Sequence, residues 1–217
     1  MTKNFSEDVA IVIKNIHLEG HLDIPLGAKG LVLFAHGSGS SRFSPRNRFV
    51  ARFLNEQRVA TLLIDLLTSE EERIDEETRE FRFSIDLLSQ RLLQITEWIA
   101  KDGRTQNLSL GYFGSSTGAA AALEAAAQSK HPVHAVVYRG GPPDLAQSFL
   151  SQVKAPTLLI VGENDPEVIR LNEEAFELLQ CPKRLDIVKG ATHLVEEGGC
   201  LEKVAKLSSE WFLNYLT

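Results

Sequence analysis

The chain has 217 residues, a formal net charge of −6 and 43% hydrophobic residues. This length can bury the core of one α/β domain without disulfides or metal staples, so we expect a single domain over residues 1–217. The acidic balance and the lack of a lysine or arginine stripe argue against a nucleic-acid surface. No apolar run approaches the roughly 18 residues that span a bilayer, and the first residues lack the apolar core of a signal peptide. We therefore expect a cytoplasmic protein that binds small molecules, with no nucleic-acid or membrane partner.

Two short strands are predicted at the start of the chain, over Val9–Ile13 and Ile16–Ile24, with a turn at residues 14–15 between them. They are expected to form one edge of the sheet. His17 and His21 fall on one face of the second strand, but no further ligand pattern accompanies them. We therefore predict no metal site, and no motif in the chain calls for a cofactor.

The next segment, Gly30–Ala35, is a continuous apolar run of the kind that forms a strand buried on both faces. A loop rich in glycine and serine, His36–Ser41, ends it abruptly. Such a loop can direct backbone N–H groups at a developing negative charge, and we predict the N–H of Ser38 as one donor of an oxyanion hole. A phosphate-binding loop is the rival interpretation, but the Gly-Lys-Ser/Thr ending and the Gly-x-Gly-x-x-Gly pattern are both missing. His36 is expected to bond loop backbone.

A helix should begin at Pro45 with Ser44 as its N-cap, and a buried strand should follow at Val59–Ile64. The charged run Glu70–Glu80 has no apolar periodicity, which is typical of a solvated loop or a loose helix. Because it leaves the same end of the sheet as the other strand-to-helix loops, it is also placed to overhang a site there. Helical periodicity returns over Phe83–Lys101, and this pattern puts Trp98 in the core.

The segment Gly114–Gly118 reads Gly-Ser-Ser-Thr-Gly and joins an apolar strand to an alanine-rich helix. This is the pattern of a nucleophile elbow, in which a strained turn lifts a serine hydroxyl out of the sheet edge. Ser116 is therefore the candidate nucleophile. The N–H of Thr117, directly after it, is the second predicted oxyanion donor. The two glycines stand where a Cβ would collide as strand and helix cross closely.

The remaining strands are predicted at residues 134–138, 156–161 and 183–188, and the last of them precedes a loop and a final amphipathic helix. Asp165 lies just beyond the second of these strands, and His193 lies in the loop after the third. A catalytic histidine needs a carboxylate to hold its tautomer and to stabilise the imidazolium. Asp144 is an alternative carboxylate, although it looks more like the N-cap of the helix that follows it. About fifteen residues separate the first two strands, too few for an inserted cap domain, so the site should be open.

Four motifs in order resemble the α/β-hydrolases of the dienelactone-hydrolase-like group. They are His36-Gly37, the elbow around Ser116, the Gly-x-x-Asp turn that ends at Asp165 and the Gly-x-x-His loop that ends at His193. The resemblance covers nearly the whole chain. It implies an α/β-hydrolase fold, with a mostly parallel sheet of about eight strands, helices on both faces and no cap domain. Relatives of this group also occur fused to phosphoribosyltransferase domains.

The resemblance further implies a serine hydrolase with Ser116 as nucleophile, His193 as base and Asp165 as orienting acid. Dienelactone hydrolases proper carry a cysteine where this chain carries Ser116, so ester and thioester substrates are expected beside lactones. Two other interpretations stay open. One is a catalytically silent binding or regulatory module on the same fold, and the other is a small peptidase or acyltransferase that uses the same acyl-enzyme.

Two arginines are candidates for substrate binding. Arg42 follows the predicted oxyanion loop, and Arg139 ends the strand beyond the elbow. A guanidinium at either position is suited to clamp a substrate carboxylate or phosphate. The alternative is that both arginines pair with nearby acidic side chains or face solvent, as most surface arginines do.

Overall fold

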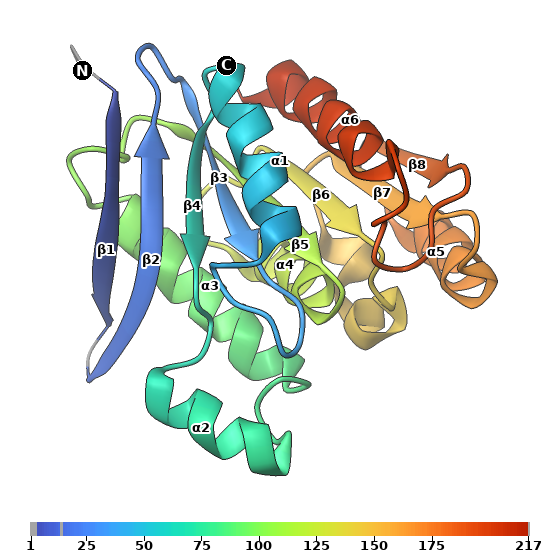
Figure 1. Cartoon of the computed structure of the whole chain (residues 1–217), viewed down its shortest axis with the longest axis horizontal. Coiled ribbons are helices and arrows are strands. Elements are labelled where there is room, and N and C mark those ends of the chain that lie inside the picture. The colour runs from blue at the N-terminus through green and yellow to red at the C-terminus, as the bar shows by residue number, and fades with distance from the viewer. Residues whose placement is uncertain (1–3, 14, 217) are drawn as a thin grey trace.

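The computed structural model describes residues 4–13 and 15–216. Its centre is one mixed sheet of eight strands in the order β1-β2-β4-β3-β5-β6-β7-β8 (Figure 1). The strands are β1 (Phe5–Ile13), β2 (Ile16–Ile24), β3 (Gly30–Ala35), β4 (Ala60–Ile64), β5 (Ser109–Ser115), β6 (Ala135–Arg139), β7 (Thr157–Gly162) and β8 (Lys183–Val188). The helices are α1 (Pro45–Glu56), α2 (Ser69–Thr78), α3 (Ile85–Ile99), α4 (Thr117–Gln128), the 3₁₀ helix η1 (Pro143–Gln152), α5 (Pro166–Leu178) and α6 (Cys200–Tyr215).

The sheet is mostly parallel, as the sequence predicts. Strands β3 to β8 all run in one direction, and only β1 and β2 are antiparallel to their neighbours. The first strand begins at Phe5, four residues earlier than predicted, and pairs with the whole of β2. The predicted turn includes Lys14, which lies outside the described residues. Strands β3, β4, β5, β6 and β7 are buried along almost their entire length, which explains their continuous apolar sequences.

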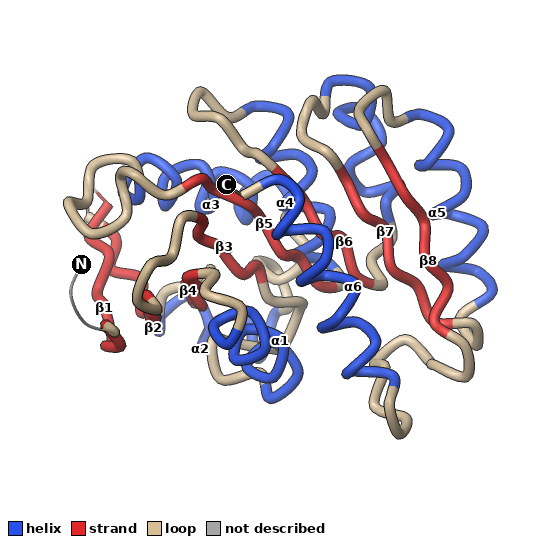
Figure 2. The backbone as a smooth tube through the Cα atoms, turned by 90° about the horizontal axis from the view of Figure 1, so that it is seen from above, coloured by secondary structure: helices blue, strands red, loops and turns tan. Residues whose placement is uncertain are grey.

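Helices cover both faces of the sheet (Figure 2). Helices α1 and α6 pack against each other on one face, whereas α3, α4, η1 and α5 form a row on the other. Each face therefore has its own apolar core, and the two cores share the sheet between them. The predicted α1 is confirmed, because the Ser44 side chain accepts from the N–H of Asn47 and Pro45 opens the helix.

Two predictions about helices need correction. Trp98 is only partly buried, because it lies at the rim of the core that α3 forms, where the Arg104 guanidinium stands 5.7 Å from its ring centroid. Asp144 does not cap a helix, since Pro142 holds the cap position and Asp144 is exposed in the first turn of η1. The proline pair at residues 142–143 accounts for the second error, because its fixed φ starts the helical turn two residues earlier.

The acidic run forms a regular helix, α2, rather than a loop. Thr68 and Glu71 make a complete capping box, in which the Thr68 hydroxyl accepts from the Glu71 N–H and the Glu71 carboxylate accepts from the Thr68 N–H. Three glutamates in the first turn also stabilise the helix, because their negative charges lie near the positive end of its dipole. In Figure 1, α2 lies below the carboxyl ends of β3 and β4. Among the described residues, no helix combines the length and apolar character that crossing a membrane requires.

Candidate active site

The strand order indicates which edge of the sheet should hold a functional site. From β3 the chain moves outward to β4, and from β4 it crosses back over β3 to β5. In open α/β sheets, ligands bind beyond the carboxyl ends of the strands where the order reverses in this way. The segments that leave β3, β4 and β5 there contain the His36–Ser41 loop, Asp65 and the elbow at Ser116.

Ser116 has the backbone conformation of a nucleophile elbow. Its φ is 53° and its ψ is −126°, a region of backbone conformation that residues other than glycine rarely occupy. Its N–H donates to the Arg139 carbonyl at 3.1 Å and its carbonyl accepts from the Ala119 N–H at 2.9 Å, so bonds on both sides of the turn hold the strain in place. The predicted strained turn is therefore present at Ser116.

The two glycines of the elbow allow three segments to approach one another. A Cβ at Gly114 would lie 2.4 Å from the Ala119 Cα, so this glycine lets β5 meet the start of α4. A Cβ at Gly118 would lie 2.3 Å from the His36 carbonyl oxygen, so the second glycine lets α4 meet the loop after β3. That second contact brings the predicted oxyanion loop against the elbow.

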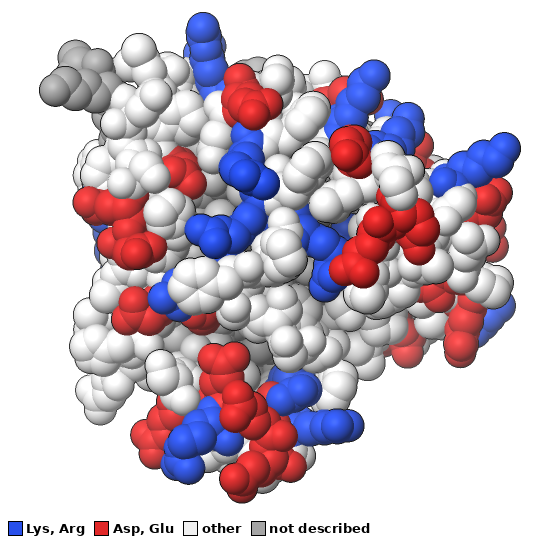
Figure 3. Space-filling view, in the orientation of Figure 1, with Lys and Arg blue, Asp and Glu red and all other residues white. Residues whose placement is uncertain are grey.

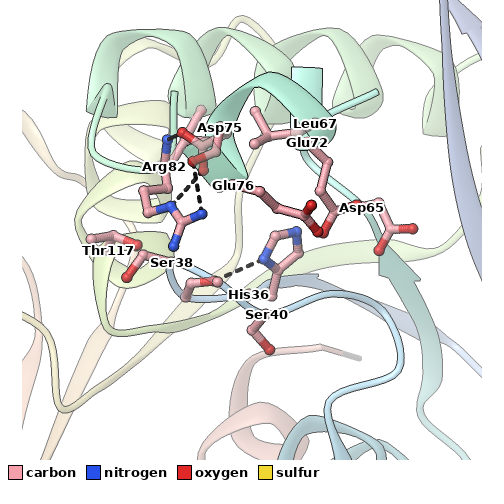
Figure 4. A pocket seen from close by; sticks show the side chains of 13 residues that line it. His36, Ser38, Ser40, Asp65, Leu67, Glu72, Asp75, Glu76, Arg82 and Thr117 are labelled. Atoms are coloured by element: carbon pink, nitrogen blue, oxygen red, sulfur yellow. Dashed lines mark hydrogen bonds and ion pairs between the residues drawn. The ribbon is translucent and has the colours of Figure 1, made fainter. Parts of the chain in front are cut away.

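The loop after β3 lies directly beside the candidate nucleophile. A Cβ at Gly37 would stand 3.0 Å from the Ser116 Cβ, and Ser38 is the next residue. Ser38 and Thr117, the two predicted oxyanion donors, line the same cavity of about 330 Å³ (Figure 4). Gly37 and Thr117 line this cavity and adjoin Ser116, whereas the side chains of Ser116, Asp165 and His193 are not part of its lining.

The His36 side chain forms hydrogen bonds with loop backbone, as predicted. Its Nε2 accepts from the Leu66 N–H at 3.0 Å, so Nδ1 carries the proton and donates to the Gly37 carbonyl at 3.0 Å. The ring is buried, and this burial lowers the pKa of His36. A neutral imidazole thus joins the end of β3 to the end of β4, and both of its nitrogens are occupied by backbone groups.

Asp165 and His193 meet although 28 residues separate them. The Asp165 Oδ2 lies 2.8 Å from Nδ1 of His193. Asp165 occupies the N-cap position of α5, yet its side chain makes no capping bond and is turned to the histidine instead. A Cβ at Gly162 would lie 2.4 Å from the Ala191 carbonyl oxygen, so this glycine lets the end of β7 approach the histidine loop. The Gly-x-x-Asp spacing therefore has a steric reason.

The Asp165 bond leaves Nε2 of His193 free to face a nucleophile. Among the described residues, Ser116 Oγ and His193 make no direct hydrogen bond; such bonds are often long in unliganded enzymes and tighten when substrate binds. The three side chains nonetheless come from the carboxyl ends of β5, β7 and β8, which are parallel and adjacent through β6.

The two predicted substrate-binding arginines have other partners. Arg42 forms an ion pair with Asp65, and its backbone N–H also donates to that carboxylate at 2.6 Å. It lines a separate surface pocket with Arg48 and Arg52. Arg139 is 6% exposed and its Nη1 donates to the His193 carbonyl at 3.3 Å. Burial lowers the pKa of Arg139 to about 10, so the guanidinium stays charged at neutral pH beneath the histidine loop.

The acidic run Glu70–Glu80, which the sequence placed over this end of the sheet, borders the cavity on its outer side, although the sequence did not indicate which of its residues line it. Glu72, Asp75 and Glu76 of α2 line it, together with Arg82 from the turn after that helix (Figure 4). The spacing of the three acids puts them on one face of a helix, and the Thr68-x-x-Glu71 capping box signals that the helix exists. In the part of the chain that the structure describes, no group of three or more His, Cys, Asp or Glu side chains could hold a metal.

This geometry agrees with comparisons to known proteins. The chain is similar to a dienelactone hydrolase from Anabaena variabilis, with 56% identity, a TM-score of 0.97 and coverage of 99% of this chain and 100% of that one. The chain belongs to the dienelactone-hydrolase-like family. It is therefore an α/β-hydrolase. An esterase from Pyrococcus furiosus, with 19% identity, a TM-score of 0.82 and coverage of 99% and 94% of the two chains, shares the fold of this hydrolase.

A second relative of this hydrolase carries a different description. A putative phosphoribosyl transferase from Mycobacterium tuberculosis is 51% identical over 210 residues, which cover 97% of this chain and 46% of that protein. The chain thus spans about half the length of this relative. No protein-family model matches the sequence.

Proposed function

We propose that this hydrolase cleaves the ester, thioester or lactone bond of a small substrate through Ser116, His193 and Asp165. One observation carries the proposal: the strained backbone at Ser116, a conformation that costs free energy and is characteristic of the nucleophile elbow. The bond between Asp165 and His193 supports it, because that bond fixes the imidazole with Nδ1 protonated. The cavity volume of about 330 Å³ favours a small substrate over a long acyl chain.

In the first half of the reaction, Ser116 Oγ attacks the substrate carbonyl carbon and its proton passes to Nε2 of His193. The electron pair of the carbonyl π bond moves to oxygen, and the N–H groups of Ser38 and Thr117 stabilise this oxyanion. When the tetrahedral intermediate collapses, the bond to the leaving group breaks and His193 protonates that group. An acyl-serine remains.

In the second half, water replaces the nucleophile. His193 takes a proton from the water as its oxygen attacks the acyl-serine carbonyl, and the second tetrahedral intermediate releases the acid while the proton returns to Ser116 Oγ. Asp165 stabilises the imidazolium that forms in each half. The buried charge of Arg139 holds the carbonyl of His193, so we assign this arginine to positioning the histidine loop rather than to binding substrate.

A fluorophosphonate probe tests the nucleophile. We predict that purified wild-type protein is labelled covalently and that Ser116→Ala is not, because only an activated serine displaces fluoride from the probe to form the phosphonate ester. Ser115→Ala is the matched control: Ser115 is the neighbouring serine, buried at the end of β5, and its removal should leave labelling in place. Persistent labelling of Ser116→Ala refutes the assignment.

A panel of p-nitrophenyl esters of increasing chain length, run beside thioesters and lactones, tests the reaction class. Turnover that falls with chain length supports a small-substrate esterase. Folded protein that turns over none of them favours the silent binding module, whereas product formation only with added amine or alcohol acceptors favours an acyltransferase.

The description of the Mycobacterium relative is consistent with different activities in different parts of its chain. The part that matches this chain is an α/β-hydrolase, and it accounts for 46% of that protein. We therefore propose that any phosphoribosyl transfer by that relative resides in the part outside the match, and we assign no such activity to this chain.

A further inference from the structure

The cavity beside the elbow lies between the loop after β3 and one face of α2. Glu72, Asp75 and Glu76 are spaced i, i+3 and i+4, so all three are on the helix face that borders the cavity. In Figure 4 these side chains lie across from Ser38 and Thr117, and the Arg82 guanidinium lies between Asp75 and those two residues. In Figure 3 acidic and basic side chains are interspersed around α2, below a hollow in the surface. The side chains of α2 therefore border a cavity whose opposite wall, at Gly37 and Thr117, adjoins Ser116.

Two of the carboxylates around this cavity have no cation of their own. Asp75 is neutralised by Arg82, whose Nε donates to Asp75 Oδ2 at 2.5 Å and whose Nη2 donates to the Asp75 carbonyl at 3.0 Å. Asp65 is neutralised by Arg42. Within residues 4–13 and 15–216, Glu72 and Glu76 take part in no ion pair. The cavity thus carries two uncompensated negative charges.

The titration of Glu72 is consistent with this imbalance. Burial raises the pKa of Glu72, and the negative charges of Asp65 and Glu76 raise it further, against smaller opposing effects of Arg42 and Arg82. Like charges gathered on one wall create a negative potential that attracts a cationic group and repels an anionic one.

An unpartnered hydroxyl in the same cavity also points to a ligand. Thr117 is 4% exposed and lines the cavity, yet its Oγ1 has no hydrogen-bond partner among the described residues. A buried polar atom left without a partner is costly, so such atoms in native proteins call for an explanation. A hydrogen-bond donor on a bound substrate would supply the missing partner, since a hydroxyl oxygen accepts.

We propose that this cavity binds the cationic part of the substrate, and that the preferred substrates are small esters or thioesters carrying an ammonium or guanidinium group. Glu72 and Glu76 hold the positive charge, and Thr117 Oγ1 accepts from a donor on the same molecule. The inference rests on the proposed serine hydrolase function, because it takes the carbonyl to lie at Ser116.

The experiment compares substrates that differ only in charge. Acetylcholine and 3,3-dimethylbutyl acetate have the same shape, with nitrogen in one replaced by carbon in the other; neither has a hydrogen-bond donor, so the pair tests charge alone. O-acetyl glycolate adds an anionic ester. Acid release measures kcat/KM for each. We expect kcat/KM for acetylcholine to exceed that for its neutral isostere about tenfold, or about 1.4 kcal/mol, which is within reach of two part-exposed carboxylates.

Variants connect this preference to α2. In the double variant Glu72→Gln/Glu76→Gln, the ratio of the two kcat/KM values should fall to about two. Glu77→Gln is the matched control, because Glu77 is an exposed acid of the same helix that lies outside the lining of the cavity. It should keep the wild-type ratio. A wild-type ratio near one, a preference for O-acetyl glycolate, or an unchanged ratio in the double variant overturns the proposal.

A binding measurement separates this inference from the proposed function. Choline and 3,3-dimethylbutan-1-ol are titrated into Ser116→Ala protein and their binding is followed by ligand-observed NMR, which needs no turnover. Choline bound more tightly than the alcohol, with the difference lost in the Glu72→Gln/Glu76→Gln background, supports the cation site even if Ser116 fails to react with the fluorophosphonate. Equal binding of the two overturns the cation site even if Ser116 is labelled.

Discussion

Gly118→Ala is expected to damage both the fold and the site, because the added methyl group meets backbone rather than side chain. Its Cβ would lie 2.3 Å from the His36 carbonyl oxygen and 2.4 Å from that of Ala35, where ordinary contact begins at 3.4 Å. The start of α4 and the end of β3 must therefore separate by about 1 Å, since both contacts are with backbone atoms, which cannot move aside as the end of a flexible side chain can.

The size of the effect follows from that displacement. Overpacking a core typically costs about 1–3 kcal/mol, and a clash with backbone belongs at the upper end. A loss of about 3 kcal/mol lowers the Tm of a domain of this size by roughly 6–12 °C. The displacement also moves the loop that carries Ser38 away from Ser116, and a misplacement of about 1 Å in an active site can cost about 100-fold in rate.

Thermal unfolding followed by circular dichroism and ester turnover measured well below Tm check the two effects separately. Gly103→Ala is the control, because Gly103 is exposed and a Cβ there meets nothing within 4 Å. We expect that control to match wild type in both assays. If Gly118→Ala melts within about 2 °C of Gly103→Ala and retains its turnover, then the contact between elbow and loop does not position the oxyanion donors.

Two further predictions concern the histidines and the carboxylate. Asp165→Asn should lower kcat by about 10⁴-fold, because an amide stabilises the wrong tautomer of His193. Asp144 is the alternative acid, and Asp144→Asn should turn over substrate like wild type. The reverse pattern would exchange the roles of the two residues. Because burial lowers the folded-state pKa of His36, unfolded chains bind a proton that the folded protein does not. The free energy of unfolding in urea should therefore fall as pH drops below about 6.5, by at most about 1.4 kcal/mol per pH unit. His36→Gln should remove this component of the slope, and an equal slope in both proteins contradicts it.

Much of the fold is readable from the sequence, because its elements obey simple patterns. The inner parallel strands are continuous apolar runs that stop at a loop containing glycine, as predicted at Gly30–Ala35 and 156–161, and the structure has strands at Gly30–Ala35 and Thr157–Gly162. Parallel strands carry their following loops to a common sheet edge, so chain order alone places Ser116, Asp165 and His193 near one another. The strain at Ser116 follows from the glycines on either side of it.

Other features depend on contacts that a single sequence does not display. Arg139 looks like a free cation at the end of a strand, but the fold buries it beneath the His193 carbonyl. Arg42 looks similarly available until β4 brings Asp65 beside it. Periodicity assigns Trp98 to the core, yet α3 ends at the rim of the sheet, where the indole is half covered. In each case the partner comes from a distant segment.

Helix α2 has no apolar pattern in the sequence because apolar burial contributes little to it. Asp75 is its only buried residue in the described part of the chain, and the helix is fastened by polar contacts instead: the Thr68 cap, the Asp75–Arg82 pair and an ion pair between Glu71 and Arg91 of α3. Hydrophobic patterning therefore carries no signal for it. The capping box is a local signal, but it predicts only where the helix begins and not what its acidic face borders.

Because α2 is held by polar contacts, the residues proposed for substrate choice can change independently of those proposed for catalysis. The elbow, the histidine loop and Asp165 are held by close backbone approaches at Gly114, Gly118 and Gly162, so changes there displace the sheet itself. Two of the α2 acids that line the cavity, Glu72 and Glu76, are exposed, and replacing either by glutamine disturbs no apolar packing. Such replacements should therefore cost little stability, within about 0.5 kcal/mol for surface positions. The charge of the cavity can change while the nucleophile and its base stay where the sheet puts them.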